Sequence, residues 1–102
     1  MSSFIVSFRI EKDSTYQDRY DSLRDRVNAI TAGVVWDETT SVYIFRANGT
    51  VSTVAHDLYI NTQINATKDT LLVVDPIRGE YKGYGIQYPA LLDLAIGIKK
   101  VA

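Results

Sequence analysis

Two short segments of this sequence, residues 42–45 and 71–74, are apolar at every position. Successive side chains of a strand point to opposite faces of a sheet, so a sheet with one face in water shows alternating apolar and polar residues. Both segments therefore predict strands that are buried on two sides. The sequence leaves two covers open for the second side, a further copy of the chain or the tail of residues 77–102.

Hydrophobic periodicity divides most of the chain into strands and helices. A period of two favours a strand, and apolar residues at every third or fourth position favour a helix. The predicted elements are a strand over residues 3–10, a helix over 15–31, a hairpin of strands 34–36 and 41–46, a helix after Thr50 with an inner stripe over 51–58, and a strand over 70–74. A short apolar helix is predicted from Pro89, because proline is favoured in the first turn.

The order β-α-β-β-α-β predicts the fold class α+β, with one domain over residues 1–102 (core 1–76, extension 77–102). Right-handed crossovers place both helices on one face of a four-stranded antiparallel sheet. In this topology the first strand and the strand over 70–74 lie at the centre of the sheet, which agrees with their sequences because these two are the most apolar. The C-terminal extension, a strand and helix segment, is expected to close the second face.

Local signals predict where the helices begin and end. Ser14 and Gln17 have the spacing of a capping box, and Gly33 is placed to end the first helix. Thr50 or Ser52 can cap the second helix.

Composition limits the chemistry open to the chain. It has 102 residues, no cysteine and a net charge of −1, which excludes disulfides, thiolate nucleophiles and cysteine-based metal sites. A chain this close to neutral is not expected to bind nucleic acid indiscriminately, although a local basic patch remains open. No segment predicts a signal peptide or a membrane span, so we expect no membrane partner and a cytoplasmic location.

The layout of residues 3–76 resembles a known family. The matching features are the strand Phe4–Phe8, the helix Tyr16–Ile30, the hairpin Trp36–Phe45 and the strand Asp69–Val74. Together they are similar to the ferredoxin-like family of the second CRISPR-associated protein and the related antitoxin-type endoribonucleases. The resemblance implies a ferredoxin-like split fold and a homodimer.

Nuclease members of that family carry a metal-binding aspartate at the end of the first strand. The equivalent position here is Arg9, or Phe8 if the register shifts by one residue, and neither ligates a divalent cation. The resemblance therefore implies weak or lost nuclease activity, and we assign neither catalytic residues nor a cofactor.

Arg9 is predicted at the end of a central strand, on the face away from the helices. A guanidinium there could bind phosphate or carboxylate by paired hydrogen bonds. An ion pair with the tail or across a dimer interface is the more ordinary alternative.

The segment Lys82–Ile86 matches the first four positions of an RNA-recognition signature, whose aromatic side chains stack on bases. Tyr84 is the stacking candidate, and a glycine-flexed strand with packed tyrosines is the alternative. Arg78 and Lys82 make the tail mildly basic, as do Lys99 and Lys100. The predicted nucleic-acid-binding residues are thus Arg9, Arg78, Lys82 and Tyr84.

Two other groups of polar residues are assigned no site. Asp18, Asp21 and Asp25 share one side of the first helix, but arginines lie between them, which predicts a solvated face with ion pairs. His56, the single histidine, lies off the apolar stripe of the second helix. We predict no metal site at either place.

Two functions from different classes follow. The first is a small homodimeric protein that associates with RNA or DNA through Arg9, Arg78 and Lys82. The alternative is a non-catalytic interaction or assembly module whose apolar sheet face is an interface with protein.

Overall fold

The computed structural model describes residues 1–102 and contains three helices and one six-stranded mixed sheet. The first six elements in the chain are β1 (Ser2–Arg9), α1 (Tyr16–Ile30), β2 (Val35–Thr39), β3 (Val42–Ala47), α2 (Val51–Ile60) and β4 (Thr70–Asp75). They are followed by β5 (Glu80–Tyr84), α3 (Pro89–Ile96) and β6 (Lys99–Lys100). The predicted order of the first six elements and the predicted helix from Pro89 are confirmed, with bounds that agree within three residues.

The strands lie in the order β2-β3-β1-β4-β5-β6, and all neighbours are antiparallel except β5 and β6. The prediction that β1 and β4 are central is therefore confirmed, although the sheet has six strands instead of four. The tail supplies the two extra strands, because β4 would otherwise be an edge with unpaired backbone groups.

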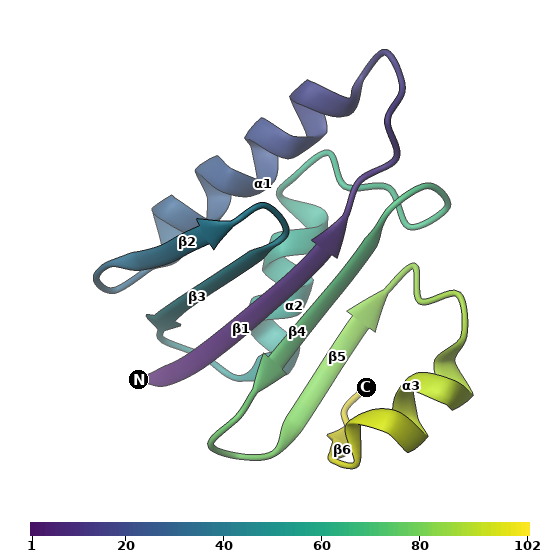
Figure 1. Cartoon of the computed structure of the whole chain (residues 1–102). Coiled ribbons are helices and arrows are strands. Elements are labelled where there is room, and N and C mark those ends of the chain that lie inside the picture. Colours follow the sequence, from purple (N-terminus) through teal and green to yellow (C-terminus); the bar gives the residue numbers. More distant parts are fainter.

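Both α1 and α2 pack on the same face of the sheet (Figure 1). The alternation in β1 directs Phe4, Val6 and Phe8 toward these helices, where Leu23 of α1 and Leu58 of α2 meet them. Full burial of a side chain of this size contributes about 1.5–3 kcal/mol. The inner stripe predicted for the second helix is confirmed, since Val51, Val54, Ala55 and Leu58 of α2 are all buried.

We call the sheet surface away from α1 and α2 the open face. Cross-strand register places on it Ser3, Ile5, Ser7, Arg9, Trp36, Val42, Ile44, Arg46, Thr70, Leu72, Val74, Tyr81 and Gly83. The helix α3 lies against the β5 side of this face, where Tyr81 Oη donates a 2.9 Å hydrogen bond to Asp93.

The prediction that the tail closes the second face is wrong for the half of the sheet formed by β1, β3 and β2. Ile44 is 39% exposed and Trp36 is 40% exposed on the open face. The reason is that the tail is used for β5 and β6, so that only eight residues remain as α3 to cover a six-stranded sheet.

Two of the predicted helix boundaries are also wrong. The capping residue of α1 is Thr15 and makes no side-chain cap; instead Asp13 Oδ1 accepts hydrogen bonds from the Thr15 backbone and hydroxyl. Gln17 donates to Asp21, one turn along the helix. The C-cap residue of α1 is Thr31 and not Gly33, because the Thr31 N–H still donates a helical hydrogen bond to the Val27 carbonyl.

The predicted cap at Thr50 is confirmed, and it forms a full capping box with Thr53. None of the three helices combines the length and the apolar character that crossing a bilayer requires.

Candidate functional site

Arg9 lies on the open face at the end of β1, as predicted. It pairs in register with Thr70 of β4, and its side chain is exposed. None of the ion pairs of the chain includes Arg9. The predicted ion pair with the tail is therefore not formed, and the guanidinium keeps its donors free.

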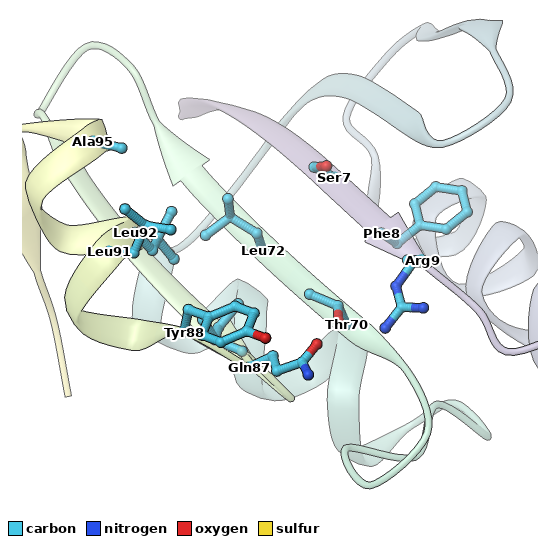
Figure 2. Close-up of a pocket in the computed structure, with 11 residues that line it drawn as sticks. Ser7, Phe8, Arg9, Thr70, Leu72, Gln87, Tyr88, Leu91, Leu92 and Ala95 are labelled. Atoms are coloured by element: carbon cyan, nitrogen blue, oxygen red, sulfur yellow. The ribbon is translucent and has the colours of Figure 1, made fainter.

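Arg9 borders a groove between the open face and α3, with a volume of about 460 Å³. The groove is lined by Ser7, Phe8, Arg9, Thr70, Leu72, Ile86, Gln87, Tyr88, Leu91, Leu92 and Ala95. Figure 2 shows that the polar ends of Arg9, Thr70, Gln87 and Tyr88 gather toward one end, while the leucines and Ala95 form the other. The groove is thus polar at one end and apolar along the rest of its length.

Local sequence explains the shape of this groove. Gly83 lies on the open face of β5, and Ile86 packs so closely over it that an added Cβ would come within 2.7 Å of Ile86 Cγ1. Between Gly83 and Ile86 the chain turns at Gly85, which has a φ of +67°, and α3 starts three residues after Ile86, at Pro89. This turn sends α3 back over the open face, next to Leu72.

Arg78 does not join Arg9. It lies in the turn between β4 and β5, at the other end of β4 from Thr70, and its Nε makes a 3.2 Å ion pair with Glu80. Its backbone N–H donates to Asp75, whose buried carboxylate organises the turn. Arg78 is therefore remote from the groove.

Lys82 and Tyr84 lie on the opposite face of the sheet from Arg9. Register pairs them with Val73 and Leu71, whose side chains face the helices. The Tyr84 ring stacks on Tyr59 of α2 with centroids 4.3 Å apart and planes 5° apart. The Lys82 ammonium lies 5.5 Å from the Tyr84 ring centroid. The structure therefore does not unite Arg9, Arg78 and Lys82 in one surface.

One face of the Tyr84 ring already has the Tyr59 ring as its stacking partner. Offset aromatic pairs contribute about 0.5–1.5 kcal/mol beyond the area that they bury. The intramolecular partner Tyr59 thus competes with any nucleobase for that face, and the geometry favours the alternative of a packed tyrosine.

A buried polar cluster around Arg19 was not predicted. Arg19 makes ion pairs of 3.0 Å with both Asp13 and Asp69, and its side chain and that of Asp69 are almost fully buried. Lys68 also binds Asp13 at 2.9 Å. Lys68 and Arg19, by hydrogen bonding to Asp13, hold the pKa of its carboxyl well below its usual value.

This cluster fastens the loop after β1 to the loop before β4. Asp69 also accepts the backbone N–H groups of Glu11 and Asn65, and Arg19 donates to the Glu11 carbonyl. Because these groups satisfy one another's hydrogen bonds, the cluster supports the structure of the two loops. The one sequence signal for this buried cluster is that Arg19 falls on the apolar side of the helix, among positions 16, 20, 23 and 27.

Two of the three acidic residues of α1 make the predicted ion pairs, because Arg24 lies 3.1 Å from both Asp21 and Asp25. His56 is exposed on α2, off the apolar stripe, as predicted. No group of three or more potential metal-ligating side chains is found in the chain.

Comparisons of the chain with protein-family models, with curated proteins and with solved structures found no match. The fold defines a compact α+β protein with one exposed, largely apolar sheet face. The open face, its groove and α3 together form the candidate functional surface.

Proposed function

We propose that this chain is a non-catalytic interaction module that forms a homodimer through its open face, built on a ferredoxin-like core of β1 to β4. The order of elements, the strand order β2-β3-β1-β4 and the single helix layer support the ferredoxin-like description. The layout resemblance of residues 3–76 to the CRISPR-associated family supports the dimer, because such proteins are typically homodimers.

The observation that carries the proposal is that the open face has both a ridge and a hollow, each apolar. The ridge is α3, on which Tyr88, Leu91 and Leu94 recur every three residues and are between 64% and 83% exposed. No residue of α3 is buried, although the helix is almost entirely apolar. An exposed apolar helix of this kind indicates a contact surface.

The hollow lies on the other half of the open face and has a volume of about 450 Å³. Exposed apolar side chains dominate it: Met1, Val34, Trp36 and Ile44. A two-fold axis between ridge and hollow would place the ridge of each chain in the hollow of the other, and such isologous pairing is the commonest form of dimer. This arrangement covers the half of the sheet that the tail leaves exposed.

Charge on the open face does not oppose this pairing. Arg9 and Arg46 lie near opposite ends of the sheet, because β1 and β3 run antiparallel, and Ile5, Val42 and Val74 lie between them. The cations can therefore remain at the polar rim of an apolar interface, which is the usual distribution.

Light scattering after size exclusion tests the proposal. The wild-type chain should have twice the mass of the 11.4 kDa monomer, and Ile44→Glu and Leu94→Glu should each be monomeric. Ile60→Glu is the matched control, because Ile60 is 56% exposed on α2, away from the open face. A wild-type monomer at all concentrations would refute the proposal, as would dissociation caused only by Ile60→Glu.

Nucleic-acid association is the second candidate, and the free guanidinium of Arg9 on an exposed sheet face favours it. Binding of single- and double-stranded RNA and DNA should be measured at about 50 mM and about 200 mM salt, with and without Mg²⁺ or Mn²⁺. Steep weakening with salt and loss in Arg9→Ala would support it. Absence of binding at low salt would remove it.

A further inference from the structure

We infer that the groove between the open face and α3 binds a small carboxylate with an aliphatic body, and that Arg9 holds the carboxylate. The groove lies within one chain, so the inference goes beyond the proposed dimer and does not depend on it. Its volume of about 460 Å³ lies in the range of pockets that hold small molecules.

The polar end of the groove has donors that no group of the chain uses. Arg9 makes no ion pair, and the side chains of Gln87 and Tyr88 make no hydrogen bond within the chain, whereas the hydroxyl of Thr70 donates to the Gly85 carbonyl. A guanidinium matches the two oxygens of a carboxylate in a bidentate pair. The Gln87 amide and the Tyr88 hydroxyl, which lie at the same end in Figure 2, can donate to the same anion.

The rest of the groove is lined mainly by aliphatic side chains, which favours an aliphatic body over a highly polar one. Leu72 forms the floor from β4, and the α3 wall consists of Leu91, Leu92 and Ala95, with Ile86 at the turn. These side chains offer no hydrogen bond to a sugar or a chain of phosphates. Burying each methylene of a ligand against them contributes about 0.8 kcal/mol.

Charge selects the sign of the ligand. Arg9 is the single charged side chain that lines this groove, and Asp93 of α3 is turned to Tyr81 on the other side of the helix. An aliphatic ammonium of the same length would bring its charge against Arg9, and an aliphatic alcohol would lack the ion pair. The geometry thus distinguishes a carboxylate from its nearest analogues.

Calorimetric titration with octanoate, octylammonium and 1-octanol tests the inference. We expect octanoate to bind best and octylammonium not to bind. Arg9→Gln should weaken octanoate binding about tenfold or more, because one charge-assisted pair is lost. Arg46→Gln is the matched control, since Arg46 is exposed on the same open face but does not line the groove. The affinity of this variant for octanoate should equal that of the wild type.

Three results would overturn the inference. The first is that the wild type does not bind octanoate. The second is that Arg9→Gln and the wild type bind octanoate with equal affinity. The third is that Arg9→Gln weakens the binding of oligonucleotides and not that of octanoate, which would assign Arg9 to nucleic acid. The Ile44→Glu variant separates this inference from the dimer, because Ile44 does not line the groove. It should bind octanoate like the wild type, and loss of binding there would refute a site formed by one chain.

Discussion

Arg19 Nε donates a hydrogen bond to Asp69 Oδ2 at 3.0 Å, although 50 residues separate the two in the chain. Both side chains are almost fully buried, and the pair joins α1 to the start of β4. Removing one partner of such a pair strongly destabilises the fold, because the other charge then remains buried without compensation.

We predict that Arg19→Met lowers the free energy of unfolding by about 3–5 kcal/mol, because the Asp69 carboxylate is then buried without its cation. Arg24→Met is the matched control on the same helix. Arg24 pairs only with Asp21 and Asp25 at the surface, so its loss should cost about 1 kcal/mol or less. Urea denaturation measures both, and equal effects would contradict the structural role of the buried pair.

The stability of the protein should fall in acid partly through Asp13. Lys68 and Arg19 lower the pKa of Asp13 in the folded protein below its unfolded value of about 3.9. A lowered folded pKa contributes stability that is fully present above the unfolded pKa and is lost as pH falls through the folded pKa. The contribution is therefore complete near neutral pH and declines below about pH 4.

We expect Asp13→Asn to be less stable than the wild type at pH 7, with a difference that narrows as the pH falls below about 4. Urea midpoints measured from neutral to acid pH test this. Asp37→Asn is the control, because Asp37 is exposed and makes no ion pair, and its difference from wild type should not vary in this way. A gap for Asp13→Asn that stays constant with pH would contradict the prediction.

The stack of Tyr84 on Tyr59 predicts a stabilising role for Tyr84. Tyr84→Ala should lower the free energy of unfolding by about 1–3 kcal/mol, while Tyr84→Phe keeps the stacked ring and should cost less. Thermal or urea denaturation measures this. If Tyr84 instead stacks on RNA bases, Tyr84→Ala will weaken RNA binding and leave stability unchanged.

Two glycines with the same positive φ predict very different costs of substitution by alanine. Gly85 and Gly97 both have a φ of +67°, but an added Cβ at Gly85 would lie 2.0 Å from the Asp69 carbonyl oxygen, whereas nothing lies within 4 Å at Gly97. Gly97→Ala should cost about 1–2 kcal/mol for its left-handed conformation. Gly85→Ala should cost that and about 1–3 kcal/mol more for the clash.

Denaturation of both alanine variants compares the two costs directly, with Gly33→Ala as a further control at an open position. Because Gly85 begins the turn that places α3 over the groove, its variant should also weaken octanoate binding. Equal stability of the Gly85 and Gly97 variants would contradict the close approach of Asp69.

Periodicity was a sound guide to the elements and a weaker guide to their ends. The stripes of α1 and α2 and the alternation of β1 were predicted from local spacing. The boundaries of α1 were not, because Asp13 and Thr31 use hydrogen bonds that compete with the expected signals at Ser14 and Gly33. Several residue types can satisfy the same free backbone groups at a helix end.

The candidate site was predicted in part. Arg9 lies on the face and at the strand end that alternation indicated. Arg78 and Lys82 were predicted from the basic character of the tail, and Tyr84 from the RNA-recognition signature. The structure separates them from Arg9, because Lys82 and Tyr84 of β5 face the helices and Arg78 lies in the β4–β5 turn. The groove was not predicted, since it needs side chains from β1, β4 and α3.

Residue type and local spacing were enough to predict the order of strands and helices, the two-sided apolar character of the central strands and the absence of cysteine chemistry. Long-range packing was needed to see that the tail extends the sheet, that α3 leaves half of the open face exposed, and that Arg9 borders an apolar groove. These outcomes depend on which segments compete for the same sheet edge and the same face, and contacts between distant segments leave no periodic signal in the chain.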